Sequence, residues 1–147
     1  MKTTEITIHT GQRRGLFDLT AECERFVAEA LADADPAAPD GLLNVFVPHA
    51  TCGLVVMELG AGSEEDLLAT LDRLLPRDDR YVHRHGSTGH GADHLVPAFF
   101  PPSITIPIVG GRLALGTWQS IALVDTNVDN DTRRVRLGYT ERVASDR

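Results

Sequence analysis

The strand patterns of this chain come in groups and do not alternate one for one with helix patterns. Alternating or continuous runs of apolar and β-branched side chains predict strands over residues 3–9, 42–49 and 53–58. Later segments show the same kind of pattern: 103–109, 112–116, 118–125 and 134–143. Because grouped strands tend to pair with their sequence neighbours, we expect an α+β fold with a mostly antiparallel or mixed sheet.

Two to three helices are expected between these strands. Apolar side chains recur at helical spacing over residues 19–34, with Thr20 as the expected N-cap. They recur again over 63–75, which begins with the capping-box pattern Ser-Glu-Glu-Asp. A shorter helix is expected over 92–99. Cys23 falls on the apolar side of the first helix, so we predict that it is buried and unreactive.

Turn residues separate the predicted elements. The run Asp-Pro-Ala-Ala-Pro-Asp-Gly over 35–41 ends the first helix, and the polar run over 127–131 connects the last two strands. Gly110 and Gly111 stand between two strand patterns, and two adjacent glycines accept the positive φ angles of a tight hairpin. We therefore predict a β-hairpin at this position.

Length and charge restrict the partners. The 147 residues predict one domain, residues 1–147. With 14 Lys and Arg against 21 Asp and Glu, the net charge of −7 repels phosphate backbones and anionic lipid, so neither nucleic acid nor a membrane is an expected partner. The two cysteines lack a disulfide-scaffold spacing, and no apolar run has the length of a membrane span. We expect a cytoplasmic protein.

Four of the six histidines fall in one glycine-rich segment. Imidazole binds zinc and other borderline metals and titrates near neutral pH. His90 and His94 are four residues apart, so they share one face of a helix. His85 lies two residues after His83, and we expect it to take no part in the site. We hypothesise a site for a divalent metal, zinc or magnesium, with these ligands: His49, His83, His90 and His94.

Other side chains offer further chemistry, each with a structural alternative. Glu58 ends an apolar strand, so it is either an exposed strand end or an acid or base with a raised pKa. Trp118 is a packing or interface anchor, while Gln119 has an amide that suits a ligand. Arg133 and Arg134 point to opposite faces of a strand. We therefore expect one of these two arginines in a site and the other in solvent.

A set of motifs runs along nearly the whole chain. It comprises Phe46-x-x-His49-x-Thr51, Glu58, Tyr81-x-His83, His94-Leu95, Ile106-Pro107-Ile108, and Leu113-x-Leu115-Gly116-x-Trp118-Gln119 followed by Arg133-Arg134. This set resembles the YjbQ family, also called the secondary thiamine-phosphate synthase family. Its most specific part is Leu-Ala-Leu-Gly-Thr-Trp-Gln combined with the upstream His-x-Thr.

The resemblance implies a compact α+β subunit assembled as a homotrimer, with histidine-lined sites near subunit interfaces. It also implies a weak thiamine phosphate synthase activity, the coupling of a hydroxymethylpyrimidine pyrophosphate to a thiazole phosphate with loss of pyrophosphate. The functional positions carried over are catalytic His49, Thr51, Glu58 and His94, with His83 beside them, and ligand-binding Trp118, Gln119 and one of Arg133 or Arg134.

The chain departs from the family pattern at two places. Glu58 is followed by Leu-Gly-Ala-Gly, where the family commonly has an Asn-Ala-Asp-Pro-like run, and His90 stands where Asn is common. These departures predict a divergent branch. Two hypotheses follow. The first is an enzyme of the YjbQ type, a transferase that acts on a small phosphorylated molecule. The second is a non-catalytic homo-oligomer that binds a metal or a phosphate ligand.

Overall fold

The computed structural model describes residues 1–32 and 40–142. In chain order its elements are β1 (Lys2–His9), β2 (Gly15–Asp18), α1 (Thr20–Leu31), β3 (Gly41–Phe46), β4 (Cys52–Met57), α2 (Ser63–Leu74), α3 (His90–Asp93), α4 (Val96–Phe99), β5 (Ser103–Val109), β6 (Arg112–Leu113), β7 (Ser120–Asp125) and β8 (Thr132–Glu141). Helices α1 and α2 are regular, whereas α3 and α4 have four residues each.

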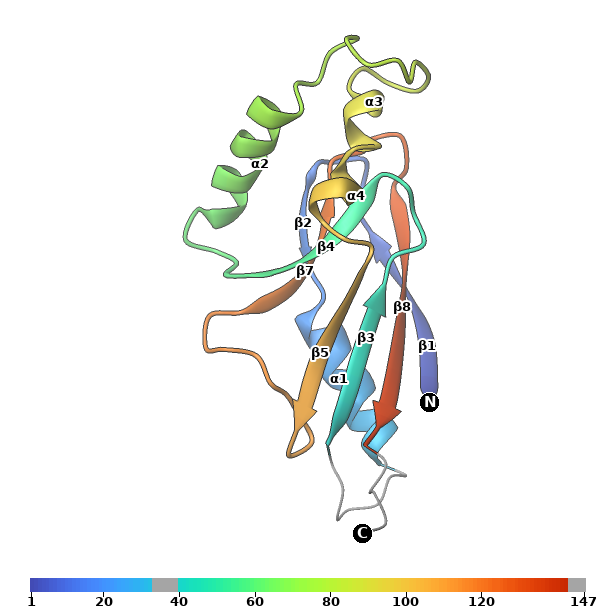
Figure 1. Ribbon diagram of the computed structural model, residues 1–147, viewed down its shortest axis with the longest axis vertical. Coiled ribbons are helices and arrows are strands. Elements are labelled where there is room, and N and C mark those ends of the chain that lie inside the picture. Colours follow the sequence, from blue (N-terminus) through green and yellow to red (C-terminus); the bar gives the residue numbers. More distant parts are fainter. Residues whose placement is uncertain (33–39, 143–147) are drawn as a thin grey trace.

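The described strands form two sheets. The larger has the order β1-β8-β3-β5-β6 and the smaller has the order β2-β7-β4, and every strand pair is antiparallel. Figure 1 shows an elongated molecule, with α1 behind the larger sheet and α2, α3 and α4 at the upper end. The expected α+β fold with antiparallel sheets is therefore confirmed.

The main core lies between the two sheets and α1. The side chains that α1 contributes have the spacing i, i+3, i+4 and i+7, which places them on one face of the helix: Cys23, Phe26, Val27 and Ala30. The opposite face of the smaller sheet is covered by residues of α2, α3 and α4, among them Leu71, Ala92 and Val96. The central strand β7 is buried on both faces, which explains its continuous apolar sequence.

The helix starts differ from the predicted ones. Thr20 is the first residue of α1, and its backbone N–H and hydroxyl both donate to the carboxylate of Asp18, at 2.9 and 2.6 Å. Helix α2 is preceded by Gly62 with no side-chain cap. The carboxylate of Glu64 accepts instead from the backbone N–H of Gly60 at 2.8 Å. The predicted N-cap at Thr20 and the predicted capping box are therefore both wrong.

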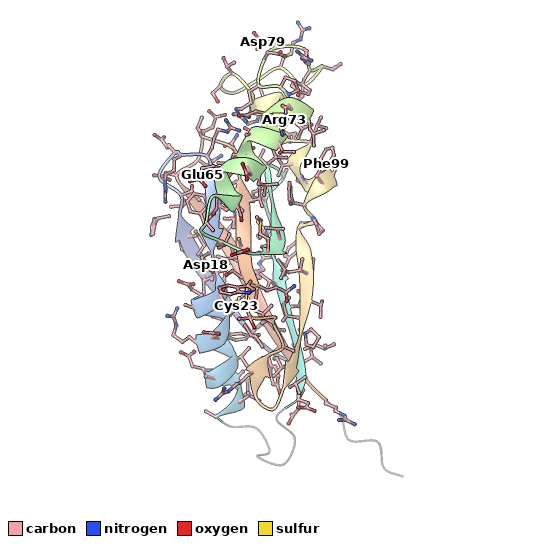
Figure 2. All side chains as sticks on the ribbon, turned by 90° about the vertical axis from the view of Figure 1, so that its left-hand side faces the viewer. Asp18, Cys23, Glu65, Arg73, Asp79 and Phe99 are labelled. Atoms are coloured by element: carbon pink, nitrogen blue, oxygen red, sulfur yellow. The ribbon has the colours of Figure 1, made fainter. Side chains whose placement is uncertain are left out.

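Other local predictions hold. Gly110 and Gly111 have φ angles of 58° and 77° in the turn between β5 and β6, which confirms the hairpin. Cys23 is fully buried on α1, close to Asp18 in Figure 2, and burial raises the pKa of its thiol to about 12. Strand β2 was not expected, and the predicted turn residues 35–39 lie outside the described residues. None of the described helices has the length and apolar character of a membrane span.

Candidate metal centre

Four histidine side chains converge on α3 and the loop that precedes it. This part of the chain lies at the upper end of the molecule (Figure 1). Each offers a ring nitrogen, and these nitrogens lie within 4.8 Å of one another: His83, His85, His90 and His94. The two Nε2 atoms of His90 and His94 are 3.0 Å apart. Since nitrogens about 2.0–2.1 Å from a tetrahedral zinc ion stand about 3.3 Å apart, this set, which we call the histidine tetrad, needs only small side-chain shifts to hold one ion.

The local backbone explains why the four rings meet. His90 and His94 lie one helical turn apart at the start and C-cap of α3, so they share a face. The preceding loop folds back over them because Gly86 has a φ of 78°, which glycine adopts without strain. A Cβ at residue 86 would lie 2.5 Å from Nδ1 of His90 and 2.7 Å from the carboxylate of Asp129. The loop can therefore approach α3 this closely only with glycine at this position.

A carboxylate holds the buried side of His90. The Oδ2 atom of Asp129 lies 2.6 Å from Nδ1 of His90 and accepts a hydrogen bond from the backbone N–H of Ser87 at 3.2 Å. Hydrogen bonds from Ser87, together with His90, lower the pKa of the Asp129 carboxyl to about 2. An ionised carboxylate therefore stands behind the ring whose other nitrogen faces the tetrad.

Below the tetrad, Asp93 is the centre of a buried polar cluster. Its carboxylate is fully buried and forms an ion pair with Arg77. It also accepts hydrogen bonds from the hydroxyl of Thr126 at 2.5 Å and from the side-chain amide of Asn127 at 3.0 Å. Because Thr126 and Asn127 follow β7 directly, these bonds join α3 to the end of the central strand of the smaller sheet. The floor of the site is thus held rigidly.

A second buried ion pair continues this cluster. Nε of Arg133 donates to Asp125 at 2.7 Å, and its Nη2 donates both to Asp125 and to the side-chain oxygen of Asn127, at 3.2 and 3.3 Å. Only 2% of the Arg133 side chain is exposed and none of Asp125. Arg133 is therefore occupied inside the protein and does not face the tetrad as a free cation.

Two rings of the tetrad, those of His83 and His94, have lowered pKa values. Burial lowers the pKa of His94, and the neighbouring rings of His83, His90 and His85 lower it further. Desolvation and the charges of His85 and His90 lower the pKa of His83 in the same way. Since only an unprotonated ring nitrogen can bind a metal, both shifts keep these two histidines ready as ligands at neutral pH.

A cavity of about 320 Å³ opens beside the exposed side of the tetrad. It is lined by His83, His85, Arg84 and residues of the loops on either side, which include Asp79 and Ser87. Figure 2 shows Asp79 at this end of the molecule, beyond α2. A small polar molecule in this cavity would reach the tetrad from the side of His83 and His85.

The tetrad differs from the set predicted from the sequence. It contains His83, His90 and His94, and it also contains His85, which the sequence analysis did not expect in the site. It does not contain His49. The Nε2 atom of His49 accepts a hydrogen bond from the backbone N–H of Arg134 at 2.9 Å, so this nitrogen is already engaged at the edge of β8. Burial, followed by the charges of Arg133 and Arg134, lowers the pKa of His49.

The remaining predicted site residues are not brought to the tetrad. Trp118 is 73% exposed, and the segment between β6 and β7 that carries it lies well below α3 in Figure 1. Gln119 accepts from the backbone N–H of Gly116 through its side-chain oxygen at 2.8 Å. Glu58 is exposed and Thr51 is buried. Their roles in catalysis or ligand binding remain predictions.

Sequence reasoning missed the residues that support the tetrad: Arg77, Asp93, Asp125, Asn127 and Asp129. The segment over 127–131 was interpreted as an ordinary polar turn, although Asn127 is fully buried. One signal was present in the sequence. Asp93 stands immediately before His94, and Asp125 ends the apolar run of β7. Acidic residues in such places often form hydrogen bonds to histidines or arginines.

The fold and the site together define a class, a small α+β protein with two antiparallel sheets and a histidine-rich group of potential metal ligands. The chain belongs to the family described as UPF0047 protein YjbQ-like, which matches residues 4–142. It is 56% identical over 141 residues to UPF0047 protein Rv2556c of Mycobacterium tuberculosis, covering 96% of this chain and 99% of that protein. A UPF0047 protein of Archaeoglobus fulgidus is 34% identical over 131 residues, covering 89% of this chain and 95% of the other.

A solved structure shares the fold. The hypothetical protein APE1520 of Aeropyrum pernix superposes with a TM-score of 0.83 at 30% sequence identity, covering 97% of this chain and all of that one. A YjbQ/UPF0047 protein of Clostridium acetobutylicum gives a TM-score of 0.81 at 26% identity, covering 93% and 99% of the two chains. Family membership and fold are thereby established.

Proposed function

We propose that this protein is a metal-dependent enzyme whose histidine tetrad binds a transition metal of the zinc type. The observation that carries the proposal is the convergence of four ring nitrogens within 4.8 Å. Four imidazoles suit zinc, copper or nickel, whereas magnesium prefers oxygen ligands, so the donor set argues for zinc over magnesium. Two free, buried cysteines agree with a reducing cytoplasm, the location that we propose.

Metal content tests this proposal directly. We expect about one equivalent of zinc or a similar metal per chain in untagged protein purified without added metal. Elemental analysis measures it, and dialysis against a chelator should remove the metal and lower the melting temperature. Protein that contains no metal and gains no stability from added zinc would contradict the proposal.

The proposed substrate is a small phosphorylated molecule held in the cavity beside the tetrad. Arg84 lines this cavity, and its Nε donates to the backbone carbonyl of Tyr81 at 3.3 Å. Among the described residues no carboxylate forms an ion pair with Arg84, whereas Arg77 and Arg80 are paired with aspartates. The terminal amino groups of Arg84 are thus available for a phosphate placed beside the metal that the tetrad would hold.

Replacing Arg84 should weaken phosphate binding. We expect Arg84→Gln to lower the affinity of the zinc-loaded protein for inorganic phosphate or pyrophosphate by about 10- to 100-fold, the contribution of a hydrogen bond to a charged group. Isothermal titration calorimetry measures the affinity. Arg73→Gln is the matched control, because it removes the same charge from the exposed surface of α2, outside the cavity (Figure 2). Equal affinity in both variants would remove Arg84 from the proposed site.

The family resemblance suggests a specific reaction and a specific assembly. We propose a weak thiamine phosphate synthase activity and a homotrimeric assembly, with Trp118, Gln119, His49 and Glu58 acting at a subunit interface. A metal beside the phosphate chain would stabilise the negative charge that develops on departing pyrophosphate. Arg133 no longer belongs to the proposed ligand set, because its guanidinium is already paired with Asp125.

A non-catalytic metal-binding role is the second candidate, and the number of histidines favours it. Four imidazoles fill all four positions of a tetrahedral zinc ion, as in structural sites, whereas catalytic zinc keeps one position open. Phosphate titration of the cobalt-substituted protein distinguishes the two. A visible spectrum that changes with phosphate supports an open, catalytic position, and an unchanged spectrum supports the closed, non-catalytic site.

A further inference from the structure

Nδ1 of His90 faces an acceptor and not solvent. Oδ2 of Asp129 lies 2.6 Å away, and the same oxygen accepts a hydrogen bond from the backbone N–H of Ser87 at 3.2 Å. Oδ2 is therefore placed as a hydrogen-bond acceptor. If Nδ1 also lacked a proton, two lone pairs would repel each other at this distance. Nδ1 therefore carries the proton and donates it to Asp129.

The second neighbour of Nδ1 does not change this assignment. The side-chain nitrogen of Asn127 lies 3.1 Å from Nδ1, but it is a donor and cannot accept the Nδ1 proton. One of its two N–H groups donates to the carboxylate of Asp93 at 3.0 Å. The shorter contact of Nδ1, 2.6 Å to Oδ2 of Asp129, still requires a proton between those two atoms. A neutral imidazole with its proton on Nδ1 has its lone pair on Nε2. This is the nitrogen that lies 3.0 Å from Nε2 of His94, inside the tetrad.

Asp129 is itself held in position. Its Oδ2 accepts from the backbone N–H of Ser87 at 3.2 Å, and its own backbone N–H donates to the side-chain oxygen of Asn127 at 3.1 Å. These bonds fix the carboxylate relative to both the glycine-rich loop and the segment after β7. The direction of the His90 ring is therefore set by residues outside α3.

We infer that Asp129 is a positioning residue of the metal centre, which fixes the tautomer and orientation of His90 so that Nε2 is presented to the metal. This inference rests on the proposed function. Carboxylates that accept a hydrogen bond from the distal nitrogen of a metal-bound histidine raise its basicity, and their removal typically weakens metal binding. A loop that sequence reasoning treats as a simple turn would then control the affinity of the site.

The inference is tested by Asp129→Asn, with Asp131→Asn as the matched control. Both remove one negative charge from the same loop, but Asp131 is exposed, and among the described residues its carboxylate forms no hydrogen bond or ion pair. We expect the zinc affinity, measured by competition with a chromogenic chelator, to fall about 10- to 100-fold in Asp129→Asn and to stay at the wild-type value in Asp131→Asn. Equal affinities in the two variants would overturn the inference.

A second measurement does not depend on metal. In zinc-free wild-type protein, the ring-nitrogen NMR shifts of His90 should report the tautomer with the proton on Nδ1, and Asp129→Asn should lose this single state. A wild-type ring with its proton on Nε2 overturns the inference even if zinc binds. Wild-type protein that binds no zinc overturns the proposed function, and a positioning role toward a metal falls with it.

Discussion

His94→Ala should lower the zinc affinity of the protein at least about 100-fold, because it deletes one of the converging ligands and not a supporting group. The Nε2 atom of His94 lies 3.0 Å from that of His90, so the vacancy falls at the centre of the tetrad. The fold should survive, since His94 is only partly buried at the C-cap of a four-residue helix. Chelator competition measures the affinity, and circular dichroism verifies the fold.

Two further variants test whether the loss of zinc affinity is specific to His94. His9→Ala removes an exposed histidine at the end of β1 and should leave zinc binding unchanged. His49→Ala separates the structure from the sequence-based hypothesis. The hypothesis places His49 among the ligands and predicts a loss of zinc, whereas the hydrogen bond from Arg134 to its Nε2 predicts nearly normal binding. Unchanged zinc binding in His94→Ala would remove this histidine from the metal site.

The fold was predictable where local patterns coincide with burial. The apolar spacing of α1 gives its buried face directly, and the adjacent glycines at 110 and 111 give the hairpin. Strand β2 escaped prediction because it is only four residues long and follows a turn, and its pairing with β7 is what makes it a strand. Pairing between distant segments is not visible in a local pattern.

The candidate site was predictable as a group of histidines but not as a geometry. The spacing of His83 and His85 already placed both on one face of an extended segment, so the sequence contained the signal for His85. The partners of the tetrad are different. Asp129 meets His90 from 39 residues away, and Thr126 meets Asp93 from 33 residues away. A polar run such as the one after β7 looks solvated until the tertiary structure supplies its buried partners.

Removing the carboxylate of Asp125 should destabilise the protein strongly. We expect Asp125→Ala to lower the free energy of unfolding by about 3–5 kcal/mol, because it leaves the Arg133 guanidinium buried without its counter-charge. Asp125 also accepts from the backbone N–H of Asn127 at 3.0 Å, so the segment beneath the tetrad loses an anchor as well. Urea-induced unfolding at a fixed protein concentration measures the change.

The matched control is Glu5→Ala, which also deletes a carboxylate paired with arginines of β8. Glu5 lies 3.0 Å from Arg136 and 3.6 Å from Arg134, and all three side chains are substantially exposed. Solvent screens such pairs, so we expect a loss of no more than about 1 kcal/mol.

An equally small loss for Asp125→Ala would contradict the assignment of Arg133 to the interior. Partial recovery of stability in the double variant Asp125→Ala with Arg133→Met would support it, because the isolated charge would then be gone. The two adjacent arginines of β8 therefore have separable roles. Arg133 stabilises the segment beneath the histidine tetrad, whereas Arg134 is exposed and pairs with Glu5 on the larger sheet.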